Sequence, residues 1–270
     1  MAQEPPAPIG HSTNLVGIPT GLLASTAFNE HPLPLHISGT REANYGLFAR
    51  LRESRDPGEA AAIFQDYMYV LFGLHGEPKA DRGGPRRFRS SYLKLLRGWG
   101  FDANNPQGAV LKGWVESRFG LFPTFHKAPL TRFGSPAWIT YIEEKMSSRF
   151  HNNSINLQLD LLYEFCQWVS ARFARPARRH LVLYRGENRF DEQRLIGPRE
   201  GRWLTVRFNN LVSFTAHRET ACEFGDYILE VRVPVVKILF FDQLLPQHPL
   251  QGEWEYLVIG GDYRVRADYF

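Results

Sequence analysis

The sequence predicts an α+β fold in which a helical part comes first and a strand-rich part follows. Up to about residue 175, apolar residues recur every three or four positions, which is the period of an amphipathic helix. From residue 176 on, short runs rich in Val, Leu, Ile and aromatic residues are typical of strands. Because the helices precede the strands and do not alternate with them, we expect an α+β arrangement and not a doubly wound parallel sheet.

The helical part contains several segments with a clear period. Helices are expected at 59–74, 90–100, 108–121, 136–151 and 155–173. The last of these segments is the most regular, and we expect one face of it to be buried. That face carries Leu157, Leu161, Leu162, Phe165 and Trp168.

Two stretches of the first part lack this period. Residues 1–10 contain three prolines, and we expect them to be disordered. Residues 76–89 form a basic loop interrupted by Gly and Pro. Its arginines are Arg82, Arg86, Arg87 and Arg89. Residues 11–270 are expected to form a single domain, helical over about 11–175 and strand-rich over about 176–270.

The strand-rich part contains several short apolar runs. Strands are expected at 180–186, 202–208, 211–216, 227–234, 236–241, 253–260 and 263–270. Residues 217–225 predict a short helix that ends near Gly225, because glycine commonly terminates helices.

Composition and short motifs exclude several classes of protein. The 270 residues are 43% hydrophobic and carry a formal net charge of +4, which tolerates a phosphorylated ligand but does not indicate nucleic acid. The two cysteines, Cys166 and Cys222, form no CxxC pair, which argues against a zinc site and a disulfide scaffold. The nine histidines show no HxxxH or HExxH spacing, so no metal is expected. The usual glycine-rich dinucleotide and P-loop motifs are absent.

The sequence also bears on localisation. Its first residues lack a basic segment followed by an apolar one, so no secretory signal is visible. No stretch reaches the ~18–20 uninterrupted apolar residues that a transmembrane helix needs. With two unpaired cysteines as well, we expect a cytoplasmic protein without a membrane span.

Two carboxylates near the C-terminus are candidates for acid–base chemistry. Glu253 and Glu255 flank Trp254 at the start of an expected strand. Side chains two positions apart on a strand project from the same face, at a separation of roughly 6–7 Å. On the residues alone, the pair is either a solvated strand end or a pair of functional carboxylates.

Two further features of the strand-rich part suit a ligand. Arg185 ends an expected strand and is followed by Gly186, which lets a ligand approach the backbone closely. An arginine fork can bind phosphate oxygens bidentately, although a surface arginine at a turn is the alternative. Ser213 and Thr215 present two hydroxyls on one strand face, with Phe214 on the other. They form either a hydrogen-bonding shelf or the ordinary alternation of a half-buried strand.

The order of these features resembles a known pattern. Arg185, then Ser213-Phe214-Thr215, then Glu253-Trp254-Glu255 is similar to the arginine–serine–glutamate pattern of arginine-specific mono-ADP-ribosyltransferases. Ser-Phe-Thr departs from the commoner Ser-Thr-Ser, but Thr215 keeps the final hydroxyl. Together with residues 10–48, "LVLYRGEN" and "GEWEYLVIGG", the chain resembles the dinitrogenase reductase ADP-ribosyltransferase family of nitrogen-fixing bacteria.

The resemblance implies a fold, a reaction and partners. It implies a split β-sandwich of two small sheets around an NAD cleft, over roughly residues 180–270. NAD would be the co-substrate, and ADP-ribose would pass to one arginine of dinitrogenase reductase, the nitrogenase iron protein, switching nitrogen fixation off. Control by PII-type nitrogen-signalling proteins is also implied.

The resemblance also implies roles for single residues. Glu255 matches the catalytic glutamate and would accept a hydrogen bond from the 2′-hydroxyl of the nicotinamide ribose. Glu253 would hold the acceptor guanidinium, and Arg185 would clamp the NAD phosphates. Ser213 would position the ribose or brace Glu255, with Thr215 supporting it. Residues 244–251 occupy the place of the family's acceptor-recognition loop.

Two other functions remain compatible with the residues. Paired carboxylates also serve a glycosidase or an NAD glycohydrolase, although retaining glycosidases place them roughly 5–5.5 Å apart and usually on different strands. The chain could instead be a non-catalytic regulatory binding protein, with the glutamates as surface residues. Two measurements distinguish a transferase, a hydrolase and a binding protein: release of nicotinamide from NAD, and attachment of ADP-ribose to arginine.

Overall fold

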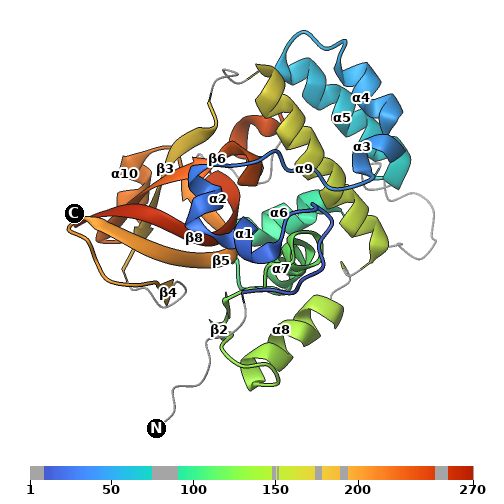
Figure 1. The fold of residues 1–270 in the computed structure, drawn as a ribbon. Helices are drawn as coiled ribbons and strands as arrows, with labels where there is room; N and C mark the ends of the chain where they lie inside the picture. The colour runs from blue at the N-terminus through green and yellow to red at the C-terminus, as the bar shows by residue number, and fades with distance from the viewer. Residues whose placement is uncertain are drawn as a thin grey trace.

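The computed structural model describes residues 9–74, 91–147, 150, 152–173, 178–188, 194–246 and 255–269. Within this part of the chain, helices come first and a sheet follows, as the α+β prediction requires (Figure 1). The helices are α1 Thr20–Ala24, α2 Thr26–Glu30, α3 Thr40–Ala43, α4 Tyr45–Leu51, α5 Pro57–Phe72, α6 Tyr92–Phe101, α7 Pro106–Phe119, α8 Pro136–Ser147, α9 Asn153–Phe173 and α10 Arg218–Cys222. The strands are β1 Phe125–His126, β2 Ala128–Pro129, β3 His180–Glu187, β4 Arg194–Leu195, β5 Trp203–Thr215, β6 Tyr227–Pro234, β7 Ile238–Phe241 and β8 Glu255–Tyr269. Short 3-10 turns lie at η1 Val235–Lys237 and η2 Asp242–Leu244.

The ends of the longer helices follow from local sequence. The side chain of Asp56 accepts a hydrogen bond from the backbone N–H of Glu59 and so caps α5, and Pro57 occupies its first turn. At the other end, Gly73 adopts a left-handed conformation (φ 61°) that stops the helix. The start of α7 is built in the same way, with Asn105 as the cap.

Helix α9 is buried on nearly every side. It packs against α5 and α6 and also against β7. The prediction of a single buried face therefore covers only part of its buried surface. Leu161, Leu162 and Phe165 are buried as predicted, but Leu157 is 54% exposed, and its assignment to the buried face is wrong. The start of α9 extends beyond the helices that cover its middle, which Figure 1 shows.

The sheet is antiparallel and is organised around β8. Strand β5 pairs with β8 from Trp203 opposite Arg266 to Thr215 opposite Glu255. Along the other edge of β8, its first half pairs with β7 and its second half with β6. Strand β6 pairs with β3, and β3 meets β5 where Tyr184 lies opposite Thr215. The two small sheets that we expected are therefore joined, because β5 and β8 run through both.

Strands β5 and β8 each cover two of the expected strands. The predicted break at Asn209-Asn210 lies opposite Gly260 in a bulge where the register shifts, whereas the predicted break at Gly261-Asp262 stays in the ladder, opposite Phe208 and Arg207. Glycine is required there because a Cβ on Gly260 would lie 1.7 Å from the carbonyl oxygen of Asn209. The prediction of separate strands at 202–208 and 211–216, and at 253–260 and 263–270, is thus corrected to two long, bent strands.

One hydrophobic core joins the helices to the sheet. Its buried side chains run from Val16 to Ala267. Helix α7 packs against β5, α9 against β7, and α1 and α2 against β8. Of the N-terminal segment expected to be disordered, Ile9 and Gly10 contact Phe122 and Leu121 through the backbone, whereas residues 1–8 lie outside the described part.

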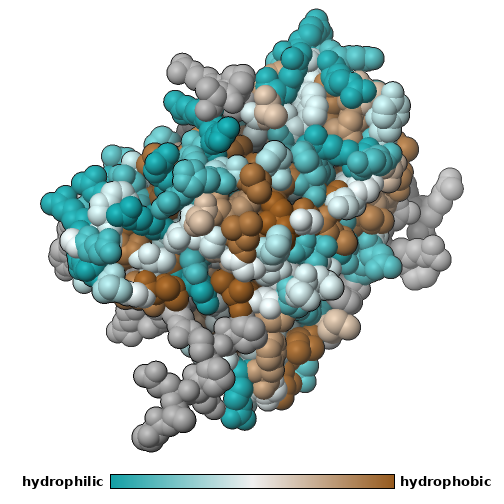
Figure 2. Space-filling model, in the orientation of Figure 1, coloured by the Kyte–Doolittle hydropathy of each residue, from teal (hydrophilic) through white to brown (hydrophobic). Residues whose placement is uncertain are grey.

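Helix α8 forms a peripheral layer with a small core of its own. Trp138 and Tyr141 face inward, onto Ala109 and Leu130. Its outer face exposes Ile139, Ile142 and Met146, and Figure 2 shows apolar surface over this helix. No helix in the described ranges is both long enough and apolar enough to cross a bilayer.

Candidate functional site

The paired ends of β5 and β8 bring the predicted serine and glutamate together. Glu255 is the first residue of β8 and lies opposite Thr215 near the end of β5. The hydroxyl of Ser213 donates a hydrogen bond to Oε1 of Glu255. The glutamate is buried, with 8% of its surface exposed, whereas Ser213 is half-buried. A carboxylate is thus held by a neutral donor at the margin of the core.

Arg185 reaches the same place from the neighbouring strand. Its Nη1 donates to the backbone carbonyl of Ser213 at 2.9 Å. Its Nε donates to the carboxylate of Glu187, which lies two residues further along β3 and so projects from the same face. The structure therefore brings Arg185, Ser213 and Glu255 together. Glu187 joins them, although no sequence motif indicated it.

The remaining predicted residues have structural partners. The hydroxyl of Thr215 accepts a hydrogen bond from the backbone N–H of His217 at 3.2 Å, which shapes the turn into α10. Phe214 points the other way and is buried in the core, as the strand alternation predicts. At Gly186 a Cβ would lie 1.9 Å from the carbonyl oxygen of Ala221. The backbone that approaches Gly186 is thus that of α10, which by itself explains the glycine.

A tryptophan from the helical part completes the site. The indole Nε1–H of Trp99 on α6 donates to Oγ of Ser213 at 2.8 Å. Trp99 is buried, with 4% of its surface exposed. The helical period of α6 places Trp99 on a buried face but does not say which strand it meets, so sequence reasoning missed this contact.

Two asparagines fix the bulge of β5 to the layer behind it. Asn209 donates to the carbonyl of Phe125 at 2.8 Å and accepts from the N–H of Thr124 at 3.0 Å. Asn210 donates to the carbonyls of Lys112 and Leu121 at 2.8 and 2.9 Å. The bulge that precedes Ser213 is therefore anchored to α7 and to the β1–β2 hairpin.

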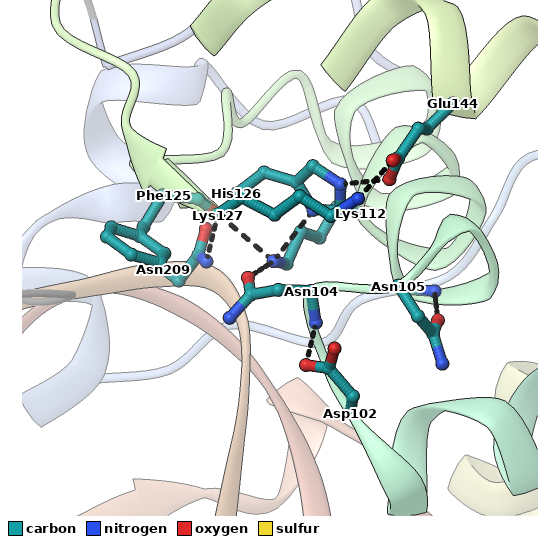
Figure 3. Close-up of polar contacts among 10 residues, drawn as sticks. Asp102, Asn104, Asn105, Lys112, Phe125, His126, Lys127, Glu144 and Asn209 are labelled. Carbon is teal, nitrogen blue, oxygen red and sulfur yellow. Dashed lines mark hydrogen bonds and ion pairs between the residues drawn. The ribbon is translucent and has the colours of Figure 1, made fainter. Parts of the chain in front are cut away.

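A buried lysine lies in the same layer (Figure 3). Nζ of Lys112 donates to Oδ1 of Asn104 at 2.8 Å and to the carbonyl of Phe125 at 3.0 Å. It also lies 3.4 Å from Nδ1 of His126, whose Nε2 is 2.8 Å from Glu144. Burial lowers the pKa of His126, and the hydrogen bond with Glu144 opposes this shift. Because an ammonium only donates, the network assigns the histidine proton to Nε2.

Several predicted residues lie outside the described part of the chain. They are Glu253, Trp254, residues 247–251 of the expected acceptor loop, and Arg82, Arg86, Arg87 and Arg89. In the described ranges, no group of three or more His, Cys, Asp or Glu side chains is arranged to hold a metal ion. The two cysteines are not bonded to each other.

Comparison with known proteins assigns this chain to a family. Residues 13–267 match the sequence model of the family described as dinitrogenase reductase ADP-ribosyltransferase (DRAT). The NAD(+)–dinitrogen-reductase ADP-D-ribosyltransferase of Rhodospirillum rubrum is 59% identical over 273 positions, which cover 100% of this chain and 99% of that protein. No solved structure matches the chain. The chain belongs to the dinitrogenase reductase ADP-ribosyltransferase family.

Proposed function

We propose that Glu255, Ser213 and Arg185 form the centre at which this enzyme transfers ADP-ribose from NAD to an arginine of dinitrogenase reductase, with release of nicotinamide. The acceptor protein and the use of NAD follow from the family and from the relative in Rhodospirillum rubrum. The observation that carries the residue assignment is the hydrogen bond from Ser213 to Glu255, at the paired ends of β5 and β8.

Glu255 is suited to stabilise charge during the reaction. Breaking the bond between nicotinamide and ribose develops positive charge on the sugar, and a fixed carboxylate stabilises that charge as it forms. The hydrogen bond from Ser213 holds one oxygen of Glu255 in place. Its burial removes much of the competing water, which strengthens the interaction with the sugar.

Arg185 is proposed to bind the phosphates of NAD. Its guanidinium is held beside the site by the carbonyl of Ser213 and the carboxylate of Glu187. A planar fork fixed in this way can present N–H groups to phosphate oxygens without first losing the freedom of a long side chain. Glu187 is proposed to set the direction of that fork.

Glu253 is proposed to act on the other substrate. It precedes Glu255 by two positions, so an extended backbone would present both carboxylates on one face. An arginine side chain is protonated at any ordinary pH and is a poor nucleophile in that form. A second carboxylate would hold the guanidinium and accept its proton as the new bond to ribose forms.

We also propose where the reaction takes place and which segment contacts the acceptor protein. A cytoplasmic enzyme that modifies one arginine and so switches nitrogen fixation off reversibly fits the family, and residues 244–251 would contact the acceptor protein. Leu244 and Leu245 anchor the start of this segment in the core. Control by a PII-type nitrogen-signalling protein is proposed from the resemblance alone.

Separate assays of the two half-reactions test the assignment. In Glu253→Gln the donor end stays intact, so slow release of nicotinamide from NAD should persist while transfer to dinitrogenase reductase falls by about 100-fold or more. Equal loss of both activities would show that Glu253 acts on NAD. If the unaltered protein releases nicotinamide but labels no arginine, the chain is an NAD glycohydrolase. If it does neither, it is a non-catalytic binding protein.

A further inference from the structure

We propose that Trp99 is a positioning residue for ADP-ribosyl transfer. It orients the hydroxyl of Ser213 toward Glu255. The inference rests on the proposed function of Glu255 and assigns a role in that site to the helical part of the chain. It starts from two hydrogen bonds that share one oxygen atom. Trp99 Nε1 lies 2.8 Å from Ser213 Oγ, and the same Oγ contacts Glu255 Oε1.

The chemistry of the three groups determines the direction of both bonds. An indole N–H can only donate, and an ionised carboxylate can only accept. A serine hydroxyl has a single proton, so Ser213 must accept from Trp99 and give its proton to Glu255. Without the indole, the hydroxyl could rotate and donate elsewhere. Trp99 therefore selects the one hydroxyl orientation that supports the glutamate.

The surroundings of Trp99 keep its ring in place. Helix α6 is capped by Ser91, and the backbone N–H of Tyr92 donates to Gln158 of α9 at 2.9 Å. Near the end of α6, the amide of Asn105 donates to the carbonyl of Gly98 at 2.7 Å. The ammonium of Lys112, drawn in Figure 3, lies 5.9 Å from the centre of the indole ring. A ring restrained by its helix and by a buried cation is a rigid support for Ser213.

The first test removes the indole N–H and keeps an aromatic ring. In Trp99→Phe, kcat for nicotinamide release should fall by about tenfold, which corresponds to the loss of one hydrogen bond. KM for NAD should change by less than about twofold, because the phosphate contacts of Arg185 are untouched. A wild-type kcat in Trp99→Phe would overturn the inference.

Trp114→Phe is the matched control. Trp114 is also buried, and its indole N–H donates to Asp160 at 2.7 Å, away from Ser213 and Glu255. It should lose thermal stability without losing kcat. If both variants lower kcat equally, the loss is a general effect of a damaged core, and the positioning role is wrong.

A double-mutant cycle with Ser213→Ala tests whether Trp99 acts through Ser213. In the Ser213→Ala background, Trp99→Phe should lower kcat no further, because the hydroxyl that it orients is already gone. In the Ser213→Thr background, which keeps a hydroxyl, the effect of Trp99→Phe should remain. Multiplicative effects in the Ser213→Ala background would contradict the inference.

A direct measurement covers the case in which Trp99→Phe does not fold. The chain has six tryptophans, so NMR of the indole N–H groups gives few signals. One of them should shift in Ser213→Ala because it loses its acceptor, and six unchanged signals would refute the contact. Failure of the proposed function can be told apart from failure of the Trp99 inference. A wild-type protein that releases no nicotinamide contradicts the role of Glu255 itself, and the inference about Trp99 then fails as well.

Discussion

Single residues of the site are joined over long distances in the chain. Ser213 contacts Trp99 and Glu255, which are 114 and 42 residues away. Ser213, Glu255 and Arg185 could be predicted as candidates because they match a recurring motif whose members are expected to face substrate. Trp99 and Glu187 could not, because they contact those candidate residues without belonging to the motif. Helical and strand periods state which face a residue occupies but not which partner it meets.

Lys237 is a second buried lysine in the described part of the chain. Its Nζ donates to the carbonyl of Gly260 at 3.1 Å, and it lies 5.4 and 5.1 Å from the ring centres of Phe28 and Tyr263. Burial lowers the pKa of Lys237 to about 7, although the carboxylate of Asp262 partly opposes the shift. The amine is therefore largely neutral in the folded protein above pH 7, where an unfolded lysine is charged.

This pKa difference predicts how stability depends on pH. Between pH 7 and about 10.4 the unfolded state binds one more proton than the folded state, so stability rises with pH. We expect the free energy of unfolding of the wild type, relative to Lys237→Met, to rise by about 1.4 kcal/mol per pH unit from pH 8 to pH 10. Urea unfolding at each pH measures the difference. A flat difference would mean that Lys237 titrates alike in both states.

At the scale of elements, the sequence predicts where helices and strands occur, but it does not predict whether two neighbouring strand segments form one continuous strand. Asn209-Asn210 and Gly261-Asp262 are residue types that favour turns, so each pair predicted a break. In the fold Asn209-Asn210 form a bulge opposite Gly260 within one continuous strand, because the asparagine amides bind backbone groups of α7 and the β1–β2 hairpin. Those partners are distant in sequence, so local preference alone could not distinguish a bulge from a turn.

The bulge explains a requirement for glycine that can be measured. In Gly260→Ala the added methyl group would overlap the carbonyl of Asn209, and we expect a loss of about 2–3 kcal/mol in the free energy of unfolding. Gly46→Ala is the control, because nothing lies within 4 Å of its Cβ position in α4. That change should be neutral or stabilise by about 0.5 kcal/mol. If Gly260→Ala is tolerated equally well, β5 and β8 do not approach each other as described.

At the scale of the whole molecule, the helical part and the sheet share one hydrophobic core beside the candidate site. The core runs through both, and α6 delivers Trp99 to the ends of β5 and β8. The α+β class could be predicted because helical and strand periods occupy different halves of the chain. The proposed role of the helical part could not, because it rests on the hydrogen bond between Trp99 and Ser213, which are 114 positions apart. That Glu253 completes the site on the acceptor side stays a prediction.

Glu255 is proposed to drive the transfer of ADP-ribose to dinitrogenase reductase. Labelled NAD and dinitrogenase reductase, incubated with either wild type or Glu255→Gln, test it most directly. We expect the wild type to label one arginine of the acceptor protein, located by peptide mapping. Glu255→Gln should label it at least about 100-fold more slowly, as expected for a fixed group that stabilises developing charge, while calorimetry shows NAD binding largely retained. Labelling by Glu255→Gln at close to the wild-type rate would contradict the account.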